Sequence, residues 1–162
     1  MAFASYKEAA AALRRYLNDT PQLNELDEDF ESTDDELEDY IKDCLNDINL
    51  NSDPITRFML SDIITEPGED SPTGMPIPWS TVKMGAVIQL LTAKGIHSAR
   101  NMLTFSDAGG VQITNHDKWG RYINYYNVLI PKYEKAVAQL KIRANINQGF
   151  GGVSSPFSFD VY

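Results

Sequence analysis

Hydrophobic residues recur every three or four positions over most of the chain, which is the spacing of helices that bury one face. The clearest stretch follows Thr33, which stands three residues before Glu36, and this spacing is a capping box that begins a helix. The hydrophobic positions that follow fall on one helical face: Leu37, Tyr40, Ile41, Cys44, Leu45 and Ile48. We therefore expect an amphipathic helix over residues 33–48.

Similar signals predict four more helices. A second capping-box spacing begins one at Ser5, proline in the first helical position begins another after Asp53, and Ser80 can cap a third. Asn115 can cap the longest, which carries an aromatic stripe expected to lie in the core and in which Pro131 predicts a kink or a break. These helices are expected over residues 5–17, 53–65, 80–94 and 115–144.

Other segments lack the helical pattern. Residues 66–78 hold four prolines, which fix φ angles and remove N–H donors, and two glycines, and this composition predicts a loop. Gly95 is expected to end the preceding helix, and residues 102–114 contain two short β-type runs around a turn with glycines, which predicts a β-hairpin. The expected fold class is mainly α: a bundle of about five helices in a single domain, residues 1–146, with this hairpin inserted before the long last helix.

The last residues of the chain have a different pattern. After Ile146 the helical spacing stops, yet Phe157 and Phe159 alternate with polar residues, which suits a strand or a row of plugs added to a partner surface. Residues 147–162 are too few to build a core of their own, so we expect an extended C-terminal docking arm that orders on another protein. The expected partner-binding residues are Phe150, Gly151, Gly152, Val153, Pro156, Phe157, Phe159, Val161 and Tyr162.

Charge is distributed unevenly along the 162 residues. The formal net charge is -9, of which residues 1–70 contribute -14 and residues 71–162 contribute +5. The block from Glu25 to Asp39 contains no basic residue and is expected to be solvated. This balance argues against non-specific binding of nucleic acid, and no apolar run approaches the roughly 20 residues of a membrane-spanning helix.

Candidate chemistry is sparse. His97 and His116 have no second histidine or cysteine at metal-ligand spacing and are expected in solvated loops, and Cys44 is expected to be a core residue. The acidic residues Asp27, Asp29, Glu31 and Glu38 imitate a calcium loop, but Ser32 stands where the sharp turn requires glycine. We therefore expect no catalytic, cofactor-binding or metal site and no enzymatic activity; a small hydrolase with paired carboxylates is a minor alternative.

The second half of the chain resembles the adaptor, or head–tail connector, proteins of tailed bacteriophages. The segments that carry the resemblance are Trp79 with residues 83–87 (KMGAV), 94–100 (KGIHSAR), 106–111 (SDAGGV) and 145–154 (NINQGFGGVS). In that family, helical subunits form a ring, commonly dodecameric, beneath the portal, and an extended C-terminal arm of each subunit docks on the portal. The resemblance implies that residues 148–162 are this arm, with Phe150, Phe157, Phe159 and Tyr162 as plugs.

The expected function is therefore that of a structural virion protein in the phage neck, made in the host cytoplasm and partnered by the portal, other neck or tail proteins and copies of itself. An acidic ring would let DNA pass, because like charge disfavours phosphate contacts. No specific nucleic-acid partner and no membrane partner are expected. The alternative is an acidic helical interaction module that binds a basic protein through residues 25–39.

Overall fold

The structure, a computed structural model, is mainly helical. It describes residues 3–20, 32–51, 54–66, 71, 75–100, 104–106, 112–114 and 119–150. The helices in these residues are α1 (Tyr6–Leu17), α2 (Asp34–Leu50), α3 (Trp79–Arg100) and α4 (Trp119–Phe150). The mainly α class is confirmed, whereas the expected count of five helices is wrong, because the described part of the chain contains four.

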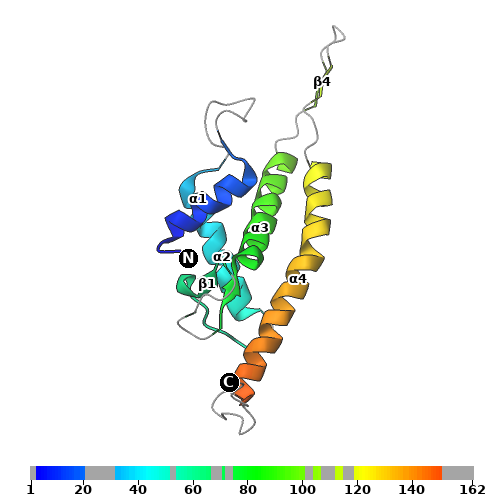
Figure 1. Ribbon diagram of the computed structural model, residues 1–162. Coiled ribbons are helices and arrows are strands. Elements are labelled where there is room, and N and C mark those ends of the chain that lie inside the picture. The colour runs from blue at the N-terminus through cyan, green and yellow to red at the C-terminus, as the bar shows by residue number, and fades with distance from the viewer. Residues whose placement is uncertain are drawn as a thin grey trace.

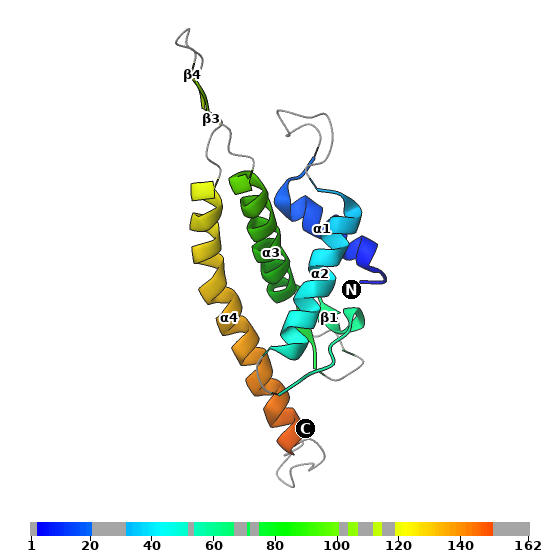
Figure 2. The ribbon, with the colours of Figure 1, turned by 180° about the vertical axis from the view of Figure 1, so that it is seen from behind.

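The helices lie side by side, with α3 between α4 and the pair formed by α1 and α2 (Figures 1 and 2). α3 and α4 run in opposite directions, and the chain between them carries β3 (Thr104–Ser106) and β4 (Gln112–Thr114) beyond their shared end. These two strands pair antiparallel with Phe105 opposite Ile113. They lie inside the segment predicted as a hairpin, and residues 107–111 between them are outside the described residues.

The two predicted N-caps begin α1 and α2, and the reciprocal capping box is complete at α2. The Thr33 hydroxyl accepts from the Glu36 N–H at 3.2 Å, and the Glu36 carboxylate accepts from the Thr33 N–H at 2.9 Å. At α1 the Ser5 hydroxyl accepts from the Glu8 N–H at 3.3 Å, while the Glu8 carboxylate accepts from Ala4. Each cap satisfies N–H groups that the first turn of a helix leaves unpaired.

The core follows the hydrophobic stripe of α2. Leu37, Ile41, Cys44, Leu45 and Ile48 are all buried, as predicted, and Tyr40 packs against them half-buried. α1 adds Ala9, Ala10 and Leu13, α3 adds Val82, Ala86, Val87 and Leu90, and α4 adds Val137, Leu140 and Ala144. The stripe of α4 is therefore core in its second half, whereas its aromatic residues Tyr122 and Tyr126 toward the start are only half-buried.

The helix predicted over residues 53–65 is wrong: residues 54–65, the part of that segment that the structure describes, contain no α-helix and only the short 3-10 helix η1 (Leu60–Asp62). The amide side chain of Asn49 holds the chain extended there: its Oδ1 accepts from the Phe58 N–H at 2.8 Å and from the Thr56 hydroxyl at 3.1 Å, and its Nδ2 donates to the Phe58 carbonyl at 3.0 Å. These bonds compete with helical ones, because they occupy the same backbone groups. Pro54 is compatible with the first position of a helix, but that compatibility does not make the residues after it helical.

Two short strands lie at the ends of the segment rich in proline. β1 (Ile63–Ile64) pairs parallel with β2 (Ile77–Pro78), and Ile63 and Ile77 are fully buried opposite each other. The proline-rich segment was expected to be loop throughout, and its last two residues instead form β2. Directly before β1, the buried Asp62 carboxylate accepts from the Met59 N–H at 2.8 Å and from the hydroxyl of Ser71, which lies between the two strands in the sequence, at 2.6 Å.

The last two helices are longer than their sequence signals indicated. α3 begins at Trp79, passes through a buried Gly95 and ends at Arg100, so Gly95 does not end it. α4 is described from Trp119, and the predicted cap Asn115 lies outside the described residues; the helix passes through Pro131 without interruption, so the expected break is absent, although the helix is bowed (Figure 1). It ends at Phe150, so the first four residues assigned to the extended arm are helical.

Candidate functional site

The residues predicted to bind a partner lie at and beyond the end of α4. Phe150 is the last residue of that helix, and the other predicted contact residues, from Gly151 to Tyr162, are outside the described part of the chain. Among the side chains of α4 that the structure describes, which end at Ile146, Ala144 is the last buried one, and Asn145 and Ile146 are exposed. The helix itself continues to Phe150.

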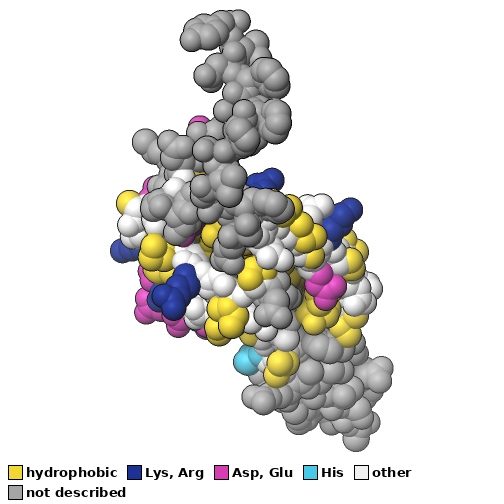
Figure 3. All heavy atoms as spheres, turned by 90° about the horizontal axis from the view of Figure 1, so that it is seen from below, with side chains coloured by type: hydrophobic (Ala, Val, Ile, Leu, Met, Phe, Trp, Pro, Cys, Tyr) yellow, Lys and Arg dark blue, Asp and Glu magenta, His cyan; other side chains and the backbone are white. Residues whose placement is uncertain are grey.

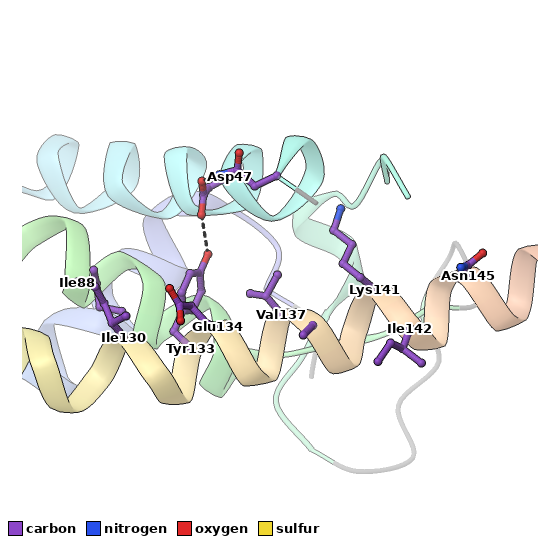
Figure 4. Close-up of a pocket in the computed structure, with 11 residues that line it drawn as sticks. Asp47, Ile88, Ile130, Tyr133, Glu134, Val137, Lys141, Ile142 and Asn145 are labelled. Carbon is purple, nitrogen blue, oxygen red and sulfur yellow. Dashed lines mark hydrogen bonds between the residues drawn. The ribbon is translucent and has the colours of Figure 1, made fainter. Parts of the chain in front are cut away.

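A groove of about 540 Å³ lies along α4. Asp47 of α2, its C-cap Asn51, Ile88 of α3 and Tyr133 and Lys141 of α4 contribute to its walls. Figure 4 shows Tyr133 and Lys141 reaching toward α2, while Ile142 points away from it. The groove is thus the place where α2, α3 and α4 meet, and its polar side chains tie α4 to α2.

Cys44, Gly85 and Tyr133 come together beside this groove, one from each of three helices. The Tyr133 hydroxyl donates to an Asp47 carboxylate oxygen at 3.1 Å, and the Cys44 sulfur lies 3.7 Å from the same hydroxyl and donates to the Val82 carbonyl at 3.4 Å. Burial raises the pKa of the Cys44 thiol to about 12, and the nearby charge of Asp47 adds to that rise. Cys44 is therefore a neutral core side chain, as its place on the stripe of α2 predicted.

Tyr133 shares this protonation behaviour. Burial raises the pKa of its hydroxyl, and the neighbouring Cys44 and Asp47 raise it further. Both groups therefore stay protonated at neutral pH, which suits hydrogen-bond donors that hold a helix junction and does not suit a nucleophile or a general base.

Lys141 is the one basic side chain that is buried among the described residues, at 3% exposed. Its ammonium donates to the Pro54 carbonyl at 2.9 Å, to the Thr56 hydroxyl at 3.1 Å and to the Asn49 carbonyl at 3.2 Å. Asn49 belongs to the last turn of α2, where carbonyls have no partner within the helix and favour a cation. Lys141 thus joins α4 to the end of α2 and to the extended segment after it.

The acidic block contains residues 25–39, of which the structure describes residues 32–39. Arg14 binds next to the start of this part: its guanidinium bridges Asp19 and Asp34, at 2.8 Å each, and donates to the Ser32 carbonyl at 2.7 Å. The Ser32 N–H in turn donates to Asp19 at 3.1 Å. These contacts bring the residues on either side of segment 20–31 together and orient the start of α2.

The acidic side chains that follow are mostly on the surface of α2. Asp34, Asp35, Glu36 and Asp39 are exposed and Glu38 is half-buried, which agrees with the expected solvated helix start. Three members of the imitated calcium loop, Asp27, Asp29 and Glu31, lie outside the described residues, as does His116. His97 is exposed but belongs to α3, not to a loop. In the part of the chain that is described, no three metal-ligating side chains cluster.

The outer face of α4 was missed by the sequence reasoning, which followed only the inner stripe. Four large hydrophobic side chains are more than half exposed on this helix, namely Tyr125, Val128, Ile142 and Ile146. Exposed Lys132 and Lys135 lie between the two apolar pairs. In the sequence, these exposed positions form a second series that recurs at steps of three and four residues. The two series can be told apart only when the buried side of the helix is known.

Comparison with known proteins adds no relative: no protein-family model, no curated protein and no solved structure matches this chain. Among the described residues, no helix combines the length and the apolar character needed to cross a bilayer. The function must therefore be argued from the sequence resemblance and from the surfaces described above.

Proposed function

We propose that this protein is a head–tail adaptor of a tailed bacteriophage, which forms a ring beneath the portal and docks on it through a C-terminal arm. The proposal rests on the sequence resemblance and on the course of α4. That helix carries the chain from Ala144, the last buried residue among its described side chains, to Phe150, and twelve residues follow. An arm that starts at the end of this helix would reach a neighbouring protein without unfolding the helical body.

Ring symmetry makes such an arm effective. A single segment of twelve to sixteen residues that orders on binding loses conformational entropy, and its few aromatic contacts repay that loss only modestly. When many identical arms engage one ring, each later arm binds at the effective concentration set by its neighbours. Weak single contacts then sum to a stable joint between adaptor and portal.

The acidic first half of the chain fits passage of DNA. Residues 1–70 carry a formal charge of -14, and Glu36 lies exposed at the start of α2. Such a surface disfavours the phosphate contacts that make nucleic-acid binding tight, so duplex DNA would move past without adhering. Assembled rings that retain duplex DNA at moderate salt would contradict this part of the proposal.

The test is assembly with a portal. We propose mixing the full-length chain with candidate portal and neck proteins and counting adaptor–portal complexes by electron microscopy and sedimentation. The variant Phe157→Ser, Phe159→Ser, Tyr162→Ser removes three aromatic plugs, and it should abolish complexes while its circular-dichroism melt stays unchanged. The matched control Ser154→Ala, Ser155→Ala, Ser158→Ala changes three neighbouring residues and should still assemble. If the aromatic variant assembles as well as the unaltered chain, the docking arm is refuted.

The second candidate is an acidic module that binds a basic protein through residues 25–39. The observation that favours it is the exposure of the acidic side chains at the start of α2. This function requires binding that weakens strongly with salt and that survives loss of residues 151–162. The adaptor function requires the opposite response to truncation, so one experiment separates the two.

A further inference from the structure

We propose that the exposed face of α2 in one copy of this chain packs antiparallel along the outer face of α4 in the next copy. The acidic face consists of Asp35, Asp39, Asp43, Asn46 and Leu50, and the basic face consists of Val128, Lys132, Lys135, Gln139 and Arg143. All ten side chains are exposed. The inference deepens the proposed adaptor function, on which it rests for closure of the contact into a ring.

The first step is the match in spacing. Read forward along α2, the acidic face has steps of four, four, three and four residues. Read backward along α4 from Arg143, the basic face has the same steps in the same order. Because both segments are helical and rise about 1.5 Å per residue, residues matched in this way come level with one another when the helices lie antiparallel.

The second step is the match in chemistry that this register gives. Asp35 comes opposite Arg143, Asp43 opposite Lys135, and Leu50 opposite Val128. The two remaining positions pair Asp39 with Gln139 and Asn46 with Lys132. Acid therefore meets base at two levels and apolar meets apolar at one, and no level places like charges together.

A parallel arrangement fits less well. Aligning Asp43 with Lys135 in that direction places Leu50 beside Ile142, but it brings Asp35 to Asn127 and Asp39 to Pro131. One charge pair is then lost. Complementary charge fixes register and rejects wrong partners, so the sequence favours the antiparallel arrangement.

The charges on these faces are available for a partner. In the described part of the chain, no ion pair joins Lys132, Lys135 or Arg143 to an acidic side chain. Asp35 and Asp43 likewise have no basic partner among the described residues, and Asp39 shares Lys42 with Glu38 in a solvent-exposed cluster. Exposed pairs of that kind contribute little and exchange readily.

The position of the two faces selects a second copy of the chain as the occupant. α2 and α4 lie on different sides of α3 (Figures 1 and 2), and Ile142 on α4 points away from α2 of its own subunit (Figure 4). Seen from below, hydrophobic side chains lie exposed across the surface among basic and acidic ones, with a group of acidic side chains at one edge and a further acidic patch on the opposite side (Figure 3). Two complementary faces at different places on one molecule form a head-to-tail contact, which closes into a ring or continues as a filament.

Engineered cysteines test the register with the chain alone. Cys44 is buried, so the new thiols supply the reactive groups. At high chain concentration under mild oxidation, the double variant Asp39→Cys, Gln139→Cys should give a ladder of dimers, trimers and larger species. Each single variant should remain monomeric, because head-to-tail contacts never bring two identical positions together. Leu50→Cys with Val128→Cys should also form a ladder, whereas Leu50→Cys with Ile142→Cys, which reports the parallel register, should not.

Charge reversal gives the second measurement. Lys135→Glu should weaken self-association in sedimentation by at least about tenfold, and Asp43→Lys should do the same, because each places like charges at one level. The chain that carries both reversals should recover association. Any one of four results would overturn the inference. They are no ladder from either antiparallel pair, dimers from a single cysteine variant, a ladder from the parallel pair, and a double reversal that does not restore association. Because no portal is present, failure here leaves the docking arm standing, and failure of portal docking leaves this contact standing.

Discussion

Replacing Gly85 with alanine tests the helix junction directly. A Cβ built at Gly85 would lie 2.3 Å from the Cys44 sulfur and 2.7 Å from Cε2 of Tyr133. Ordinary contacts between such atoms are about 3.5–4.0 Å, so α2 or α4 must move by roughly an ångström. Both neighbours belong to the packed core, since Cys44 is fully buried and Tyr133 is held by Asp47.

The magnitude follows from two opposing effects. Alanine in place of glycine inside a helix normally stabilises by about 0.5–1 kcal/mol, because it reduces the freedom of the unfolded chain. Overpacking a tight core costs about 1–3 kcal/mol, and two contacts this short place Gly85→Ala at or beyond the upper end of that range. We expect a net loss of about 2 kcal/mol in the free energy of unfolding, which lowers the melting temperature by about 4–8 °C in a chain of this size.

The assay is urea unfolding followed by circular dichroism, with Gly120→Ala as the matched control. Gly120 is also helical, and a Cβ there would meet nothing within 4 Å, so this control should be neutral or slightly stabilising. Adding Cys44→Ala to Gly85→Ala removes the nearest atom, and the double variant should lose less than the sum of the single losses. A stable Gly85→Ala chain, or strictly additive losses, would refute the close approach of the three helices.

Three further outcomes are expected. Lys141→Met should lower the free energy of unfolding by about 1–3 kcal/mol, because two carbonyls and a hydroxyl lose a buried donor, whereas the exposed Arg143→Met should change it little in the same urea titration. Arg14→Lys keeps the charge but loses the planar fork that joins Asp19, Asp34 and the Ser32 carbonyl, so its denaturation midpoint should fall by the equivalent of about 1–2 kcal/mol. The Cys44 thiol should resist maleimide at pH 8 until the chain unfolds. Since its folded pKa is raised to about 12, the unfolded state releases its proton first, and melting temperatures should fall as pH rises from about 9 toward 12, less so in Cys44→Ala.

Local signals predicted the elements whose hydrogen bonds are local. Thr33 and Glu36 form the capping box that their spacing indicated, and the buried positions of α2 follow the stripe read from the sequence. The helix predicted over residues 53–65 was wrong because the contact that decides the backbone conformation there comes from outside that segment. Asn49, which belongs to the preceding helix, holds the backbone at Phe58 extended, and no propensity of the segment itself reports that bond.

The ends of α3 and α4 were misjudged for a related reason. Glycine and proline, here Gly95 and Pro131, usually interrupt helices. Tertiary packing against neighbouring helices can outweigh such local preferences. Gly95 is buried within α3, which continues past it to Arg100. Pro131 is exposed, which leaves its ring on the outer side of a bowed α4, where the carbonyls freed by proline can meet water.

The outer face of α4 shows what the sequence held but could not reveal. Its residues share one helix with the core stripe, and both series recur at steps of three and four, so periodicity alone does not say which side is buried. Only the position of Val137 and Leu140 in the core assigns Lys135 and Gln139 to the surface. Once the exposed residues of α4 are known, the sequence shows that their spacing and charges match those of the exposed face of α2.

A weak contact between copies suits an adaptor better than a strong one. One helix pair with two charge pairs buries less surface than the roughly 1,200 Å² that stable interfaces need, so the free chain should be largely monomeric. On a portal, each docked arm would hold neighbouring subunits at high local concentration, and the contact between α2 and α4 would then form without further association cost. Sedimentation should therefore show monomers at micromolar concentration without the portal and complete rings with it. A stable ring formed by the chain alone would contradict this division of labour.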